Sequence, residues 1–406
     1  MKKTAIVSCY FIHSYGSMLQ AYATQKELDN LGYNNETINV SGFLRDLRIN
    51  QYFYILKAGI QSELFQSRIA RIKNMVTKKV VTNKYTENIK MRDQKFEEFY
   101  AKYITLSQPC ESLKVLKRKC MSDYKNVVVG SDQLWLPQNI AANYYTLNFV
   151  PDGINTVAYA TSFGVSTLPQ NAQNMARKFL PKIRHLSVRE HAGQKLVKEI
   201  TGRNVPVLCD PTLLLSRKDW DEIQESRPLI DEPYIFCYFF GDSQIQRDNA
   251  KKVAQKIGCK IVALTHLNYH IDADDEYADI TPFDVGPDGF LNLIKYATYV
   301  LTDSFHGTVF SIIYQKDFFN FRKKNSNSQV NSQSTNNRFD TLLDMFGVKD
   351  RIIYGDDDIL PYLDRHIDYS KVEERLKVLQ EQSSEYLVKS LDDTGSTDLS
   401  MNGVIS

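Results

Sequence analysis

The sequence has no long hydrophobic run and almost no excess of charge of one sign. No stretch of its 406 residues approaches the roughly 20 apolar residues that a membrane-spanning helix needs. Lysine and arginine number 50 against 48 aspartate and glutamate, and the net charge of +2 gives no support to a nucleic-acid partner. The first residues, MKKTAIVSCYF, contain only a short apolar run, which indicates a first strand and not a signal peptide.

Cysteine patterns typical of metal sites or disulfide frameworks are also missing. The six cysteines form no CxxC pair and no zinc spacing. Several lie in apolar runs, where cysteine is usually a small buried hydrophobic residue. The histidines show no pairing typical of metal ligation, so we expect no metal. We interpret the free thiols as a sign of a reducing cytoplasm and expect a cytoplasmic protein.

Apolar runs that end in small polar turns, each followed by a helical pattern, recur along the chain. The first is 4–10, followed by a turn at 13–17 and a helical segment at 18–31. The same order returns at 234–257, after a charged stretch at 216–232. This order predicts parallel sheets with crossover helices. Because the chain is too long for one ordinary core, we predict two α/β domains.

We predict a first Rossmann-like domain over 1–212, a second over 213–368, a C-terminal helix over 369–391 and a disordered tail over 392–406. The first domain contains a helical insertion at 43–104. Between Phe43 and Lys95 there are 12 basic and 4 acidic residues, a net +8. A solvated helical surface explains this charge, and so does a basic surface for an anionic membrane face or a lipid-linked acceptor. A loop rich in Ser, Asn and Gln is expected at 325–337.

The most informative segment is YVLTDSFHGTVFSIIY, residues 299–314. An apolar strand ends in a polar turn, and an apolar helical pattern follows. The first turn of such a helix offers free N–H groups, here around Ser304 and Gly307, to a phosphate or carboxylate. His306 adds a group that can carry a proton near neutral pH. A histidine that caps the helix or is buried with a hydrogen bond is the alternative interpretation.

Small polar turns end the strands of both halves. If the two sheets face one another, these turns line a cleft between the domains. Taken one at a time, Gly, Ser and Asp are ordinary turn residues. Taken together, they favour a cleft. The residues expected to line it are His13, Ser14, Gly16, Ser131, Asp132, Gly164 and Gly241.

Several cations follow strands and could hold an anionic substrate. Arg189 follows the run 186–188, and Arg322, Lys323 and Lys324 follow the run 318–321. Arg338 follows the Asn-rich loop and could clamp an anion when that loop closes. Solvated surface charge explains each of them equally simply.

These segments resemble the polysaccharide pyruvyl transferases. The likeness rests on HSYGSMLQAYATQKEL, VVVGSDQLWLP, YATSFG with LSVREH and VLCDPTLLL, and YVLTDSFHGTVFSIIYQKDFFNFR. A weaker piece, NNRFDTLLDMFG, matches a pattern usual near the family's C-terminus. Together they span roughly residues 4–346, and the insertion at 43–104 has no counterpart in the family core.

The resemblance implies a GT-B-like fold and transfer of pyruvate from phosphoenolpyruvate to two hydroxyls of a sugar, as a cyclic ketal. His306 would be the general acid, because the vinyl carbon of the donor must gain a proton. Arg189 and a cation after the last strand, with Arg322 as first choice, would hold the donor. Asp132 is a candidate base toward the acceptor. No step needs a redox cofactor or a metal.

Two alternatives stay open at this point. A glycosyltransferase that uses a nucleotide-sugar shares the fold and the phosphate-binding helix. A non-catalytic binding protein could keep the cleft without the chemistry. The acceptor sugar, its hydroxyl pair and the oligomeric state cannot be inferred from these residues.

Overall fold

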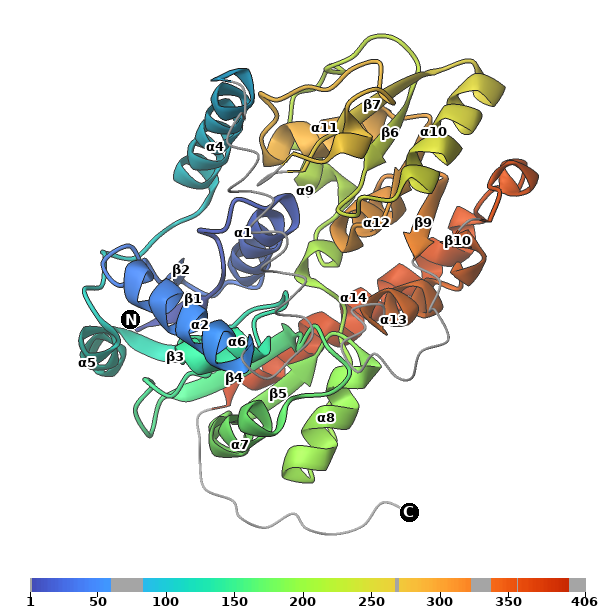
Figure 1. Ribbon diagram of the computed structural model, residues 1–406. Helices are drawn as coiled ribbons and strands as arrows, with labels where there is room; N and C mark the ends of the chain where they lie inside the picture. Colours follow the sequence, from blue (N-terminus) through green and yellow to red (C-terminus); the bar gives the residue numbers. More distant parts are fainter. Residues whose placement is uncertain (1, 60–82, 267–269, 323–336, 356, 394–406) are drawn as a thin grey trace.

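The computed structural model describes residues 2–59, 83–266, 270–322, 337–355 and 357–393. Two five-stranded parallel sheets, flanked by helices, follow one another along the chain, as predicted (Figure 1). The first contains β1 (Lys3–Val7), β2 (Asn35–Thr37), β3 (Tyr124–Val129), β4 (Asn155–Thr161) and β5 (His185–Val188). The second contains β6 (Tyr234–Tyr238), β7 (Lys260–Leu264), β8 (Tyr299–Thr302), β9 (Phe318–Arg322) and β10 (Ile352–Tyr354).

The strand order reverses once in each sheet. The first sheet has the order β2-β1-β3-β4-β5, and the second has the order β10-β9-β8-β6-β7. The chain therefore leaves β1 toward one side and returns on the other side at β3, and the same reversal separates β7 from β8. Open parallel sheets bind ligands outside the carboxyl ends of the strands at such a reversal. The turns after β1, β3, β6 and β8 are thus the expected positions of a site.

The helices connect parallel strands, as parallel pairing requires. In the first half they are α1 (Tyr15–Asn30), α2 (Leu44–Gly59), α4 (Asn83–Tyr103), α5 (Leu113–Asp123), α6 (Pro137–Ala142), α7 (Gln170–Phe179) and α8 (His191–Thr201). Then follow α9 (Arg217–Asp221), α10 (Gln244–Ile257), α11 (Pro287–Tyr296), α12 (Phe305–Ile313), α13 (Asn337–Phe346) and α14 (Tyr369–Asp392). The central strands are buried on both faces, which explains their continuous apolar runs.

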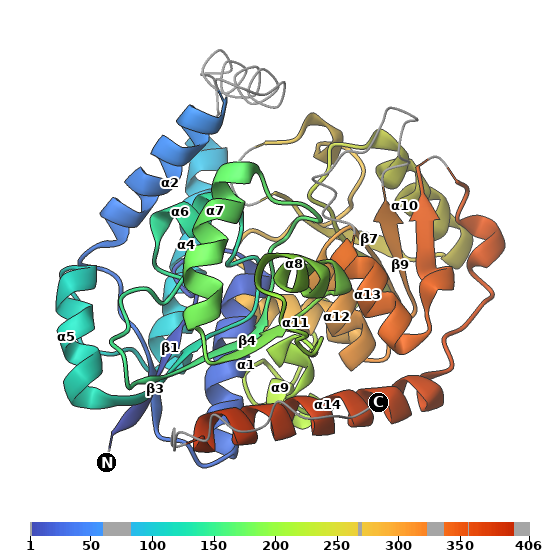
Figure 2. The ribbon, with the colours of Figure 1, turned by 90° about the horizontal axis from the view of Figure 1, so that it is seen from below.

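Two helices pack against the half of the molecule to which they do not belong in sequence. The last helix, α14, returns to the first sheet and runs along its lower side (Figure 2). There Asn155 Nδ2 donates to the carbonyl of Ser390 at 2.7 Å. In the other direction, Arg92 of α4 donates to the carbonyl of Thr265 in the second half at 2.9 Å. These contacts join distant parts of the chain, at the start of β4 and just after the end of β7.

Parts of three segments named above lie outside the described residues. The proposed insertion at 43–104 contains α2 and α4, whereas 60–82 are not described. The same holds for 325–336 of the Asn-rich loop and for 394–406 of the tail. Within the described part of the chain, no helix combines the length and apolar character that crossing a bilayer requires.

Candidate active site

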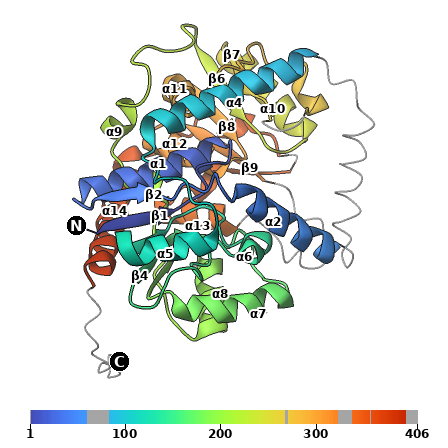
Figure 3. The ribbon, with the colours of Figure 1, turned by 90° about the vertical axis from the view of Figure 1, so that its left-hand side faces the viewer.

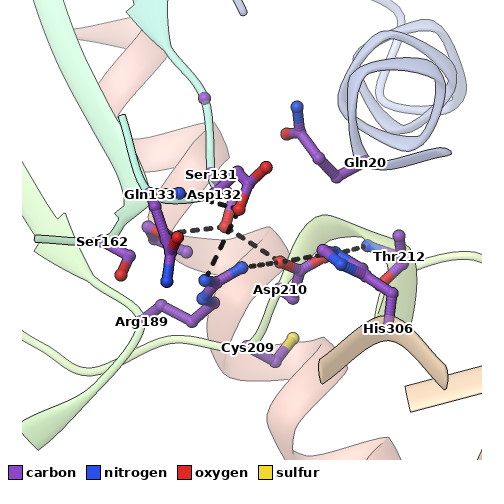
Figure 4. A network of polar contacts seen from close by, with 12 residues as sticks. Gln20, Ser131, Asp132, Gln133, Ser162, Arg189, Cys209, Asp210, Thr212 and His306 are labelled. Carbon is purple, nitrogen blue, oxygen red and sulfur yellow. Dashed lines mark hydrogen bonds and ion pairs between the residues drawn. The ribbon is translucent and has the colours of Figure 1, made fainter. Parts of the chain in front are cut away.

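Polar side chains from both sheets converge at the carboxyl ends of their strands (Figure 4). Asp132 follows β3, Arg189 follows β5, and Asp210 lies in the loop just before a short 3-10 helix. His306 comes from the second half of the chain, in the first turn of α12. The candidate site therefore lies between the two domains and uses residues of both.

The buried carboxylate of Asp210 is the centre of this network. Its Oδ2 lies 2.7 Å from Arg189 Nη1, 3.0 Å from Ser131 Oγ and 3.6 Å from His306 Nε2. Its Oδ1 accepts hydrogen bonds from the backbone N–H and the hydroxyl of Thr212. Burial opposes ionisation, but His306 and Arg189 hold the pKa of Asp210 well below its ordinary value. An ionised Asp210 thus lies between Arg189 of the first domain and His306 of the second.

Arg189 is buried, and it keeps unused hydrogen-bond donors. Besides its ion pair with Asp210, the guanidinium lies 3.9 Å from Asp132 Oδ1 and 4.2 Å from the centre of the Phe305 ring in the second domain. Its Nε and Nη2 have no hydrogen-bond partner among the described residues. Unsatisfied buried donors are costly, so a planar guanidinium with two of them is suited to an anionic ligand.

Asp132 presents its carboxylate to the first turn of α1. Its backbone is left-handed, with φ at 77°, and its Oδ2 accepts a hydrogen bond from Ser17 Oγ at 2.7 Å. Burial again opposes ionisation, yet Arg189 and His306 lower the pKa of Asp132. The side chain is 15% exposed, whereas that of Asp210 is fully buried. Of these two carboxylates, Asp132 is therefore the one that an incoming ligand can reach.

His306 is packed directly against the first domain. A Cβ added to Gly16 of α1 would lie only 1.9 Å from His306 Nδ1, so the ring occupies the space that a glycine leaves free. Ser304 caps α12 by accepting a hydrogen bond from the N–H of Gly307 at 3.2 Å. The Nε2 of His306 has no hydrogen-bond partner among the described residues, although Asp210 is near. This buried nitrogen therefore lies beside the carboxylate without a hydrogen bond to it.

A small pocket opens beside Arg189 between the domains. Its lining includes Arg189, Leu208 and Asp210 from the first domain and Phe305, Arg338 and Leu342 from the second. The guanidinium of Arg338 lies 5.7 Å from the centre of the Phe305 ring, which the guanidinium of Arg189 also contacts. Burial and the nearby Arg189 lower the pKa of Arg338 to about 10. An anion in this pocket would relieve the repulsion between the two arginines.

Arg322, the first choice for the donor cation, lies at the end of β9. Its Nη1 forms an ion pair with Asp340 of α13 at 2.5 Å, and its guanidinium lies 5.0 Å from the centre of the Phe339 ring. These contacts hold α13, which carries Arg338, against the end of β9. The other two candidates for this role, Lys323 and Lys324, lie outside the described residues.

His13 and Ser14 lie at the start of α1, to one side of the network. His13 Nδ1 lies 2.7 Å from Asp93 Oδ1 of α4, and its ring stacks on Phe96 with centres 5.5 Å apart. Ser14 is the N-cap residue of α1, but its side chain makes no capping hydrogen bond. Both residues thus border the contact between α1 and α4.

The remaining two glycines expected at the cleft shape neighbouring turns. Gly164 has a left-handed φ of +65°, and a Cβ there would lie 3.0 Å from the side chain of Gln133. The N–H of Gly241 donates to Asp303 Oδ2 at 3.0 Å, which joins the turns after β6 and β8. Asp303 precedes the cap of α12, so this contact helps to fix the helix that carries His306.

The sequence patterns did not identify three residues of the network as site residues. The sequence did contain a signal for Asp210, which follows an apolar run and precedes a proline at the start of a helical turn. Glu190 accepts hydrogen bonds from Ser162 Oγ and the N–H of Phe163, and burial raises its pKa. Ser17 is hidden in an ordinary helical pattern, and no sequence signal indicates its contact with Asp132.

Comparison with solved structures defines the class of fold. UDP-N-acetylglucosamine 2-epimerase from Rickettsia bellii is 11% identical to this chain, with 97% of each chain covered and a TM-score of 0.51. UGT89C1 from Arabidopsis thaliana, complexed with UDP-L-rhamnose, is 11% identical over 97% of this chain and 98% of the other, with a TM-score of 0.49. The likeness to the epimerase confirms the expected GT-B-like fold of two Rossmann-like domains.

The family follows from the sequence comparison. A family model described as polysaccharide pyruvyl transferase matches residues 15–324, which include Asp132, Arg189, Asp210 and His306. This chain belongs to the polysaccharide pyruvyl transferase family, as its resemblance indicated. A search of the curated proteins finds no significant match to it.

Proposed function

We propose that this protein transfers a pyruvyl group from phosphoenolpyruvate to two hydroxyls of a sugar and forms a cyclic ketal. The proposal rests on one observation: among the described residues, His306 Nε2 and Arg189 Nε and Nη2 have no hydrogen-bond partner, and both side chains contact Asp210. Phosphoenolpyruvate needs both features, since it carries a phosphate, a carboxylate and a vinyl carbon that must be protonated.

The donor would bind between the two arginines. Arg189 supplies Nε and Nη2, and Arg338 supplies an Nε that has no partner among the described residues. Guanidinium groups bind phosphate and carboxylate through paired N–H bonds, which a small dianionic head can accept. The N–H groups of Ser304 and Gly307 already donate to Thr302 Oγ1 and Ser304 Oγ, so the first turn of α12 would add only the positive end of the helix dipole. Because the pKa of Arg338 is lowered by burial and Arg189, a bound anion also removes an unfavourable interaction.

The transfer would begin with proton donation from His306 to the methylene carbon of the donor, which becomes a methyl group. The neighbouring carbon gains positive charge, and a sugar hydroxyl attacks it. The proton of that hydroxyl passes to Asp132, which transfers it to His306 and so returns both groups to their starting states. The bond to phosphate then breaks, a second hydroxyl attacks the same carbon, and its proton leaves with the phosphate. The products are a pyruvate ketal and hydrogen phosphate, with no net oxidation or reduction.

Asp132 supports an assignment of the acceptor to the side of α1. It is partly exposed, and Ser17 holds its Oδ2. We assign the acceptor to the first domain (1–212) and most donor contacts to the second (213–368), with Arg189 as the exception. The acceptor would be a glycan or lipid-linked saccharide in surface polysaccharide synthesis. We place the protein in the cytoplasm, in peripheral contact with the inner membrane surface.

Ligand-induced thermal stabilisation tests the donor. Phosphoenolpyruvate should raise the melting temperature of the protein, because a ligand that binds only the folded state stabilises it. A UDP-sugar should not, and inorganic phosphate should compete with phosphoenolpyruvate. Stabilisation by the UDP-sugar alone would instead favour a glycosyltransferase. No stabilisation by either, together with no product, would favour a non-catalytic binding protein.

Turnover tests the chemistry. With candidate glycans, the protein should release phosphate and add the mass of a pyruvyl ketal to the glycan. We expect His306→Ala to lower turnover by about 10²–10⁴, the usual effect of losing a general acid. Donor-induced stabilisation should persist in this variant, because the two arginines remain. Wild-type turnover in His306→Ala would remove the proposed proton donor.

A further inference from the structure

Helix α2 (Leu44–Gly59) attaches to the body of the protein along one side only. Leu47 is buried, Gln51 Nε2 donates to Asn139 Oδ1 of α6 at 2.9 Å, and the hydroxyl of Tyr54 donates to Asn171 Oδ1 at 3.0 Å. These positions, spaced by three or four residues, form one side of the helix. The view in Figure 3 shows α2 at the outer edge of the first domain, with α6 on its inner side.

The opposite face of α2 exposes large apolar side chains. Ile49, Tyr52 and Phe53 are 38%, 59% and 63% exposed, and their spacing places them on one helical face. Within the described part of the chain, Phe53 and Tyr52 are the two most exposed large hydrophobic residues. Single exposed apolar residues are ordinary, but three neighbours on one helix face mark an interaction surface.

Cations accompany this apolar face. Arg45, Arg48 and Lys57 are all exposed on α2, and Asp46 is its one acidic residue. The surrounding sequence from Phe43 to Lys95 carries a net charge of +8, whereas the whole chain carries +2. The excess of positive charge in the protein is therefore concentrated in the segment that contains α2.

We propose that α2 is a membrane-surface helix that binds anionic lipid headgroups. Ile49, Tyr52 and Phe53 would enter the interface between headgroups and acyl chains, where aromatic rings are favoured. Arg45, Arg48 and Lys57 would lie at the headgroup level and pair with lipid phosphates. The charge argues for this partner, because an apolar face flanked by cations matches an anionic bilayer. The inference does not depend on the pyruvyl donor, since it uses no residue of the cleft.

Sedimentation of the full chain with lipid vesicles tests this surface. The protein should sediment with vesicles that contain phosphatidylglycerol, much less with vesicles of phosphatidylcholine alone, and progressively less as salt is added. Two double variants separate the contributions: Tyr52→Ser with Phe53→Ser removes the apolar part, and Arg45→Glu with Arg48→Glu reverses the charge. Each should weaken binding on the order of tenfold or more. Because these side chains are exposed, the melting temperature should not change.

A matched control is Val378→Ser, which removes an exposed apolar side chain (51% exposed) on α14. It should bind the vesicles as the wild type does. Failure of the wild type to bind anionic vesicles would overturn the proposal, and so would wild-type binding by both double variants. A wild-type dimer in size-exclusion chromatography that Tyr52→Ser with Phe53→Ser converts to a monomer, without vesicle binding, would assign the face to a second copy of the chain and refute the lipid partner.

Discussion

The contact between Gly16 and His306 permits a sharp test of the site. Replacing Gly16 by alanine adds one methyl group, and its carbon would lie 1.9 Å from Nδ1 and 2.4 Å from Cγ of His306. Ordinary contacts begin at 3.4 Å, so a group must move by 1.5 Å, from 1.9 Å to 3.4 Å. Either the ring turns away from Asp210 or the two domains separate at this point.

The expected effect on turnover follows from that displacement. A misplacement of about 1 Å in a catalytic group can cost on the order of 10²-fold in rate. Losing the acid entirely costs about 10²–10⁴-fold. We therefore expect Gly16→Ala to lower kcat/KM by about 10²-fold or more, close to the effect of His306→Ala. Alanine is the better helix former by about 0.5–1 kcal/mol, so helix propensity does not predict unfolding.

The assay is phosphate release from phosphoenolpyruvate in the presence of an acceptor, in a double-mutant cycle. In the His306→Ala background, Gly16→Ala should have almost no further effect, because the three nearest atoms to the new methyl group all belong to His306. Gly130→Ala is the control, since its new methyl group would meet nothing nearer than 3.6 Å. Full activity of Gly16→Ala would refute the reasoning, and so would an equal loss in both backgrounds.

Two further variants test the electrostatics. Arg338→Gln should raise the donor KM and reduce stabilisation by phosphoenolpyruvate. The side chain of Arg322 pairs with Asp340, so Arg322→Gln should mainly lower the free energy of unfolding, by about 1–3 kcal/mol. Equal effects of the two variants on donor binding would contradict this division. In the folded protein the pKa of Asp210 is depressed, so its carboxylate stabilises the fold above the unfolded pKa of about 3.9, and this contribution is lost as pH falls below that value. Asp210→Asn should therefore flatten the acid limb, which is the fall in the free energy of unfolding as pH decreases. Urea unfolding between neutral and acidic pH measures this, and an unchanged acid limb would exclude Asp210 as its source.

Much of the fold follows from local patterns in the sequence. Runs such as 127–129 and 299–302 are apolar without alternation because helices cover both faces of their strands. The turns that end them are polar because their side chains form the hydrogen-bond networks at the strand ends, such as Ser131 with Asp210 and Asp303 with Gly241. This is why the positions of Asp132, Arg189 and His306 could be proposed from the sequence.

Pairings between distant side chains could not be predicted in this way. Nothing in the sequence near Arg322 indicates that Asp340 lies beside it, and nothing near His13 indicates Asp93, which is 80 positions away. The packing of α14 on the first sheet could not be predicted either. Its helical pattern indicates which face is apolar, but not which surface that face covers. Such contacts depend on how two completed domains meet.

The first turn of α1 contains several contacts that fix how the two domains meet. Three consecutive residues each contact a different part of the site: the Tyr15 hydroxyl donates to the carbonyl of Val285 in the second domain, Gly16 faces His306, and Ser17 donates to Asp132. A shift of this turn would therefore move the proton donor, the candidate base and the second domain relative to one another. None of the three needs to react with a substrate. Their common role explains why a glycine stands inside a helix at a position where alanine would favour the helix itself.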